Sequence, residues 1–254
     1  MTTATGPIQA PLRAAWPEGF AAFTLPHLGV VLASLLGLGA LLWLGRWTAA
    51  RGHEGRTAAI IGHLGACVWS AMMYRQIVVP DPTEPGAWHD RLPLQICDWL
   101  SLIGPLYLIT GRRWMATLLW CVGVGLSTQA FVTPIVRHGP VYPRFWEFWA
   151  FHWLVVFPPI YAVVVRGYRP WWRDFRLAVA VMLGYTLLVM PINVRFGANF
   201  AFLGDSSAGA PTLADVLGPW PARVPVIIAL AMAAMALTVA PWSVLRARRA
   251  RRVP

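Results

Sequence analysis

The sequence predicts an all-α polytopic membrane protein with seven transmembrane helices. Of its 254 residues, 57% are hydrophobic and only 12% are charged, whereas a soluble domain carries about 25% charged residues. Seven windows are apolar enough to cross a hydrocarbon core of ~30 Å, which takes about 20 residues. These windows run from 24 to 44, 57 to 79, 92 to 110, 114 to 136, 145 to 165, 177 to 194 and 221 to 242.

The predicted spans leave little chain outside the membrane. We expect an extracytoplasmic amino-terminal segment at 1–23, the seven-helix domain at 24–242 and a basic cytoplasmic tail at 243–254. The first span is longer than the apolar core of a signal peptide and has no basic stretch directly before it. We therefore expect it to be retained in the membrane.

The arginines predict which end of the bundle faces the cytoplasm, because short cytoplasmic loops carry an excess of positive charge. All 21 basic residues are arginine; fourteen fall in the loops and tail on one side, six on the other and one inside a span. This bias predicts an outside amino terminus and a cytoplasmic carboxyl terminus in the cell membrane. The arginine tail should bind anionic lipid headgroups. It is too short and too close to the membrane for us to expect nucleic-acid binding.

Two cofactor classes are disfavoured by residue content. A retinal protein needs a lysine for its Schiff base, and the chain has no lysine. Three cysteines, Cys67, Cys97 and Cys121, offer neither a disulfide framework nor metal-ligand spacing. We expect no cofactor and no metal, and we interpret Cys67 and Cys121 as ordinary apolar residues.

Several polar side chains are predicted to lie at one depth in the outer half of the membrane. With a rise of ~1.5 Å per helical residue, Cys97 lies about 8 Å and His152 about 10 Å below the outer boundary. Polar groups within spans generally face one another or a wet cavity. The layer also includes Arg75, Gln129 and Asn193 near the outer ends of their spans. We expect a polar pocket that opens toward the outer leaflet.

The segment LPLQICD at 92–98 supplies the densest polar cluster. Gln95, Asp98 and Ser101 accompany Cys97, and Ser101 follows it by one helical turn. Asp98 either supports the site or forms a buried ion pair with Arg75. His152 is either a base in this pocket or a hydrogen-bonding link between helices, and we expect Glu147 to meet headgroups or Arg144.

The long outer loop, GANFAFLGDSSAGAPTLADVLGPWPAR, includes Asn199 and carries start and stop signals for one short helix over TLADVL. Its aromatic residues would let it lie on the membrane surface. The loop is either a lid over the polar layer or a segment that only packs on the bundle.

Four blocks of sequence carry a resemblance to a known family. The segments LPLQICD, FWEFWAFHWLVVFPPIY, GANFAFL and LADVLGPWP resemble the bacterial YwaF family of seven-span membrane proteins, over roughly residues 60 to 242. That family is distantly similar to a eukaryotic membrane acyltransferase family that makes polyunsaturated ether phospholipids. The resemblance implies Cys97 and His152 as a catalytic pair. Bacterial relatives often have leucine and histidine where this chain has Gln95 and Ile96, so any chemistry of that histidine is missing.

The resulting hypothesis is a cysteine-dependent phospholipid acyltransferase or hydrolase. Cys97 would attack a lipid ester while His152 takes its proton. Gln129 or Asn193 would stabilise the oxyanion, and Arg75 would hold the lipid phosphate. The alternatives are a transporter or small-solute-binding protein, in which Pro158, Pro159 and Pro191 would break helices, and a membrane scaffold subunit.

Overall fold

The computed structural model describes residues 19–79, 91–206 and 213–250. Within these ranges all regular elements are helical, and the extended backbone amounts to one isolated bridge between Gly19 and His138. The elements in chain order are α2 (Leu25–Ala49), α3 (Glu54–Val78), α4 (Ile96–Thr110), α5 (Arg113–Leu118), the π-helix η2 (Leu119–Ser127), the 3₁₀ turn η3 (Thr128–Phe131), α6 (Pro143–Val164), α7 (Trp172–Phe196), the 3₁₀ turns η4 (Phe200–Phe202) and η5 (Leu213–Leu217), and α8 (Val224–Ala250).

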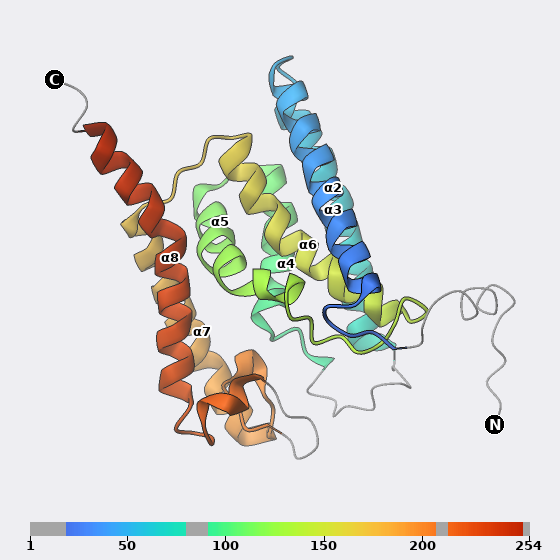
Figure 1. Cartoon of the computed structure of the whole chain (residues 1–254), viewed down its shortest axis with the longest axis vertical. Coiled ribbons are helices and arrows are strands. Elements are labelled where there is room, and N and C mark those ends of the chain that lie inside the picture. Colours follow the sequence, from blue (N-terminus) through green and yellow to red (C-terminus); the bar gives the residue numbers. More distant parts are fainter. Residues whose placement is uncertain (1–18, 80–90, 207–212, 251–254) are drawn as a thin grey trace, which may run out of the picture.

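The helices form a bundle with three central elements and two flanking pairs (Figure 1). Helices α4 and α6 and the α5–η2 segment occupy the centre, α2 and α3 pack on one side, and α7 and α8 on the other. The central helices share one apolar core. Its fully buried members include Leu100, Leu119, Val122, Val155, Tyr161, Met235 and Val239.

Six helices in the described ranges are long and apolar enough to cross a membrane, and α4 is a shorter apolar helix of 15 residues. The protein is therefore a multi-pass membrane protein. The third predicted span begins later than expected, because residues 92–95 precede the first turn of α4. The count of seven spans and the direction of insertion stay predictions.

The outer surface of the bundle is apolar where lipid would lie. Large side chains on the flanking helices are exposed, among them Leu36 at 74%, Leu187 at 76% and Leu237 at 70%. Backbone hydrogen bonds within each helix leave such a surface compatible with hydrocarbon. This exposure supports a membrane location independently of composition.

The fourth predicted span differs most from expectation. A single helix over 114–136 was predicted, but the chain forms α5, nine residues of π-helix and a 3₁₀ turn that ends at Phe131. The π-helix packs closely on two neighbours: a Cβ at Gly123 would press on Val155 of α6, and one at Gly125 would contact Met235 of α8. These close approaches favour glycine at both positions.

The prolines do not break their helices. Helix α6 continues through Pro158 and Pro159, and α7 continues through Pro191. Neighbouring helices compensate for prolines inside a bundle, and Pro158 packs directly against Gly104 of α4. The broken helices expected of a transporter are therefore absent from α6 and α7.

The two ends of the bundle differ in charge. The loops after α2, α4 and α6 and the end of α8 form what we call the arginine-rich end; the other end, which carries Cys97 and the outer loop, is the Cys97 end (Figure 1). The amino-terminal segment is described only from residue 19, and the tail only as a continuation of α8 to residue 250. In that continuation Arg246 donates to the Pro170 carbonyl at 2.9 Å and stacks on Trp171.

Two buried polar clusters hold the arginine-rich end together. In the first, Glu54 of α3 accepts hydrogen bonds from Arg166 at 2.8 Å and from the Tyr161 hydroxyl at 2.9 Å. Arg166 also donates to the carbonyl oxygens of Tyr107 and Leu108 at the end of α4. This cluster ties α3, α4 and α6 to one another.

The second cluster centres on Asp174, which is 4% exposed. Its carboxylate accepts hydrogen bonds from Arg113 at 2.7 Å, from Thr117 Oγ1 at 2.9 Å and from the Trp171 amide at 2.8 Å. The Tyr168 hydroxyl lies 3.1 Å from Thr117 Oγ1. Burial raises the pKa of Tyr168, which keeps this hydroxyl neutral beside the carboxylate.

Candidate functional site

The first turn of α4 explains the polar residues of LPLQICD. Gln95 is the N-cap of the helix, and Asp98 closes a reciprocal capping box by accepting a hydrogen bond from the Gln95 amide at 3.1 Å. The Gln76 side chain of α3 lies near this carboxylate. A carboxylate at this position satisfies orphan amide groups and faces the positive end of the helix dipole. Asp98 therefore shapes the start of α4, and its neighbour Cys97 is fixed in the same turn.

Cys97 meets a hydroxyl from the fourth span. Its Sγ lies 3.5 Å from Ser127 Oγ, and either atom has the chemistry to donate. Cys97 is half-buried and Ser127, the last residue of the π-helix, is 4% exposed. The thiol thus has a hydrogen-bond partner that is shielded from water.

His152 lies on α6 in an aromatic environment. Its Nδ1 is 2.7 Å from the Phe148 carbonyl oxygen; because a carbonyl only accepts, Nδ1 carries the proton. In the described ranges no protein group bonds the other ring nitrogen, Nε2. The ring is tilted against Phe148, and Phe131 approaches it edge-on with centroids 6.4 Å apart. This tautomer leaves the Nε2 lone pair as a proton acceptor.

Trp69 on α3 lies beside residues that adjoin Cys97 and His152 in the sequence. Its indole N–H donates to the carbonyl oxygen of Asp98, the residue after Cys97, at 3.2 Å. It also packs against the cluster that contains Phe151, the residue before His152. Helix α3 thus links the start of α4 to the part of α6 that carries His152.

The helices that carry Cys97 and His152, α4 and α6, pack closely against each other. Gly104 lies so close to α6 that a Cβ there would collide with the Leu154 carbonyl oxygen and contact Pro158. On the other side of α4, Gly65 of α3 meets Pro105 and Leu154. The absence of side chains at these glycines allows the helices of Cys97 and His152 to pack backbone against backbone.

The start of the outer loop is folded tightly against the Cys97 end. Asn193 of α7 binds Phe200 twice: Nδ2 donates to its carbonyl at 3.1 Å and Oδ1 accepts from its amide at 2.9 Å. Asn199 Oδ1 accepts from the Gly204 amide at 3.0 Å. The Ala201 amide donates to the Gln95 side chain at 3.1 Å, which joins the loop to the first turn of α4. Residues 198–204 therefore cap the Cys97 end.

This cap contains strained backbone. Ala201 and Phe202 both have left-handed φ angles, 57° and 61°, a region that residues other than glycine adopt at a cost. The hydrogen bonds between the side chains of Asn193, Asn199 and Gln95 and the backbone of this segment hold the two residues in this conformation. The expected short helix at the end of the loop is present as η5, and Arg223, which is 2% exposed, binds its residue Asp215 and the Gly204 carbonyl.

Arg75 is placed differently from what the sequence suggested. It forms an ion pair with Glu147 of α6 rather than with Asp98. Glu147 was expected to meet headgroups or Arg144; the structure pairs it with Arg75 of α3. The Arg75 side chain remains 39% exposed. Its guanidinium links α3 to α6 through Glu147 and is still partly accessible.

The structure groups the predicted site residues unevenly. Cys97 lies on α4 and His152 on the neighbouring helix α6, and Ser101 lies fully buried one turn below Cys97 with its hydroxyl bonded to the Asp98 carbonyl. Gln129 is exposed, and Asn193 already uses both ends of its amide on Phe200. The oxyanion roles of Gln129 and Asn193 stay predictions.

Sequence reasoning missed Ser127 and Trp69. Ser127 ends an apolar, glycine-rich run, and its approach to Cys97 depends on the turn of the π-helix. Trp69 is one of 15 tryptophans and has no local signal that singles it out. Only its two long-range contacts reveal its place beside the site.

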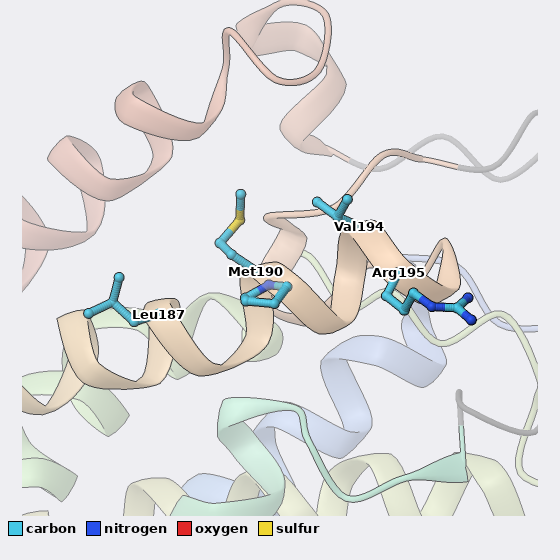
Figure 2. A pocket seen from close by; sticks show the side chains of 5 residues that line it. Leu187, Met190, Val194 and Arg195 are labelled. Atoms are coloured by element: carbon cyan, nitrogen blue, oxygen red, sulfur yellow. The ribbon is translucent and has the colours of Figure 1, made fainter.

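An open hollow lies on the surface of α7, away from this site. It is lined by one helix alone, and Figure 2 shows Leu187, Met190, Val194 and Arg195 along it. Pro191 completes the lining. Because the hollow is shallow and one-sided, it does not form an enclosed chamber for a reaction.

Metal chemistry finds no support in the described ranges. No group of three or more histidine, cysteine, aspartate or glutamate side chains there is arranged to hold a metal ion. The three thiols are free cysteines. The side-chain partner of the Cys97 thiol in the described ranges is the hydroxyl of Ser127.

The fold and site together define a multi-pass, all-helical membrane protein with a hydrogen-bonded thiol on α4 and an imidazole on the neighbouring helix α6. A family model for the TMEM164 family matches residues 22–239. The chain therefore belongs to the TMEM164 family, a family of multi-pass membrane proteins. No curated protein and no solved structure matches. The narrower resemblance to YwaF proteins and a bacterial source stay predictions.

Proposed function

We propose that this protein transfers an acyl group between membrane phospholipids, with Cys97 as the nucleophile and His152 as the general base. One observation carries the proposal: the Cys97 thiol has its own hydrogen-bond partner in Ser127, and His152 on the neighbouring helix α6 keeps Nε2 without a protein partner in the described ranges. A thiol and a neighbouring imidazole are the usual parts of a cysteine nucleophile. The distant similarity of YwaF proteins to a lipid acyltransferase family points to the same pair.

The reaction has two balanced steps. In the first, the Cys97 proton passes to His152 Nε2, the sulfur attacks the ester carbonyl carbon, and the carbon–oxygen bond breaks. The leaving lysophospholipid oxygen takes the proton from His152, and the acyl group remains on Cys97 as a thioester. In the second, an acceptor lysophospholipid hydroxyl gives its proton to His152 and attacks the thioester. The thiol is then restored.

The first turn of α4 supplies a candidate for oxyanion stabilisation. Cys97 is the second helical residue, where an amide N–H has no carbonyl partner within its own helix. In the described ranges this N–H has no other acceptor. A backbone amide next to the attacking sulfur is a suitable oxyanion donor, and it replaces Gln129 and Asn193 in that role.

The proposal assumes the predicted number of spans and the predicted direction of insertion. Seven spans with an outside amino terminus would place Cys97 and His152 in the outer half of the cell membrane. The arginine-rich end would then face the cytoplasm, where the tail would bind anionic lipid headgroups. The substrate would enter from the outer leaflet beside the cap formed by residues 198–204.

Acyl transfer is tested with the purified full chain in liposomes that contain an isotope-labelled phospholipid and an unlabelled lysophospholipid. Mass spectrometry measures the labelled acyl chain on the acceptor, and released fatty acid separates transfer from hydrolysis. Cys97→Ser should abolish both products and His152→Gln should reduce them at least about 100-fold. Cys67→Ser and His63→Gln are matched controls, because both residues are exposed on α3, and both variants should retain the wild-type rate.

Two results would contradict the proposal. Full activity in Cys97→Ser would show that Cys97 is not the nucleophile. If the wild-type protein in liposomes neither transfers nor hydrolyses acyl chains of diacyl or ether phospholipids, the proposed enzymatic activity is wrong. Binding of a small solute at the Cys97 end would then become the hypothesis to test.

A further inference from the structure

Ser127 is the hydrogen-bond partner of the Cys97 thiol, and nothing in the proposed reaction so far uses it. The two atoms, Ser127 Oγ and Cys97 Sγ, are 3.5 Å apart. A neutral thiol is only a weak donor, whereas a thiolate accepts strongly and has no proton to give. After Cys97 loses its proton, the bond therefore has one direction: the Ser127 hydroxyl donates to sulfur.

We propose that Ser127 is a positioning residue that donates a hydrogen bond to the Cys97 thiolate and holds it for attack. This inference rests on the proposed role of Cys97 as the nucleophile. Ser127 is 4% exposed, so water does not compete well for its hydroxyl. The bond is worth more in this shielded layer than it would be in water.

The neighbouring residue shows that this use of a hydroxyl is not general in the segment. Thr128 Oγ1 donates to the Val124 carbonyl at 2.7 Å, the ordinary bond of a hydroxyl within its own helix. Ser127 Oγ instead reaches across to α4. The π-helix ends at Ser127, and π-helical turns occur frequently at functional sites. Ser127 and Thr128 thus form a natural pair of test and control positions.

The charged and titratable groups around the thiol are engaged elsewhere. Asp98 caps α4 through the Gln95 amide, and the Tyr185 hydroxyl of α7 donates to the Leu94 carbonyl at 2.6 Å. On α6, His152 keeps Nδ1 on Phe148, and Arg144 lies near enough to act electrostatically on Asp98. None of these interactions uses the Ser127 hydroxyl. Removing this hydroxyl therefore takes away one hydrogen-bond donor to the Cys97 thiolate and leaves the interactions of these groups in place.

The test measures alkylation of Cys97 by iodoacetamide as a function of pH, in the full chain in liposomes. Peptide mass spectrometry separates Cys97 from Cys67 and Cys121 without further substitutions. Ser127→Ala should move the midpoint of the Cys97 profile upward by about one pH unit, as expected for loss of one hydrogen bond to a charged group. Alkylation below the midpoint should slow about tenfold, while Thr128→Ala should leave the profile in place.

Two variants of equal side-chain volume at position 127 separate the loss of the hydroxyl from a folding defect. Ser127→Thr keeps the hydroxyl and Ser127→Val removes it at equal volume, so only the valine variant should show the upward shift. In the transfer assay, loss of the hydroxyl should lower kcat about tenfold and leave KM unchanged.

Equal profiles for the threonine and valine variants would overturn the role of Ser127. If the shift is seen but the wild type transfers no acyl group, the Ser127–Cys97 bond stands and the proposed function fails. The two conclusions are thus tested separately.

Discussion

The two ends of the bundle bury polar groups in opposite ways. At the arginine-rich end, Glu54 and Asp174 each accept several strong hydrogen bonds, and each has an arginine partner. At the level of Cys97, the thiol has one long bond to a hydroxyl, and His152 keeps one ring nitrogen without a protein partner in the described ranges. Buried groups that are fully satisfied hold helices together. Groups with unused capacity are candidates for chemistry.

This contrast predicts that the arginine-rich end governs stability and the Cys97 level governs activity. Asp174→Ala should have the largest effect, because it removes the common acceptor of Arg113, Thr117 and the Trp171 amide. We expect a loss of about 3 kcal/mol in unfolding free energy, measured by titration with a denaturing detergent in mixed micelles. Arg113→Ala should cost less, because the Arg113 side chain is 47% exposed. Equal stability of Asp174→Ala and the wild type would break the comparison.

Gly104→Ala should impair both properties at once. The added Cβ would collide with the Leu154 carbonyl oxygen, and overpacking of this kind costs about 1–3 kcal/mol. Because the same contact joins the helices that carry Cys97 and His152, acyl transfer should fall further than stability alone explains. Gly184→Ala is the control, since a Cβ there meets nothing within 4 Å. A wild-type transfer rate in Gly104→Ala would separate the helix interface from the site.

Asn193→Ala should loosen the cap without unfolding the bundle. It leaves the amide and carbonyl of Phe200, which is 2% exposed, without their partner, at a cost of about 2 kcal/mol. Hydrogen–deuterium exchange should rise at residues 198–204 and stay unchanged at Glu54–Val78. Asn199→Ala removes one bond and should give a smaller rise. Unchanged exchange in both variants would show that other contacts hold the cap.

Cys97→Ser should have the smallest effect on stability. The replacement is close in size and keeps a hydrogen-bonding group opposite Ser127, so the unfolding free energy should change by under about 0.5 kcal/mol. The same variant should abolish acyl transfer. A large loss of stability would instead assign Cys97 to the structural groups, together with Asp174.

Local patterns predicted the elements well, and long-range partners less well. Apolar windows located the helices, and the signals around TLADVL located η5. The same signals were present in LPLQICD, where Gln95 and Asp98 form the capping box. Because the third span was expected to start at Leu92, these residues were interpreted as part of a pocket inside the helix.

The partners of buried charges were not readable from the sequence. Arg75 and Glu147 are separated by 72 positions, and depth alone does not say which helices are neighbours. Asn193 was placed correctly near the end of its span, yet its amide turns to the outer loop. The common layer expected for Cys97 and His152 from the helical rise stays a prediction.

The π-helix makes the fourth span sensitive to length as well as to composition. A π-turn holds one more residue than an α-helical turn, so η2 resembles an α-helix into which one extra residue has been inserted. Deleting one residue from Leu119–Ser127 would remove the wide turn and change which side chains of this segment face α4. For this segment, the number of residues is itself a determinant of what faces the thiol.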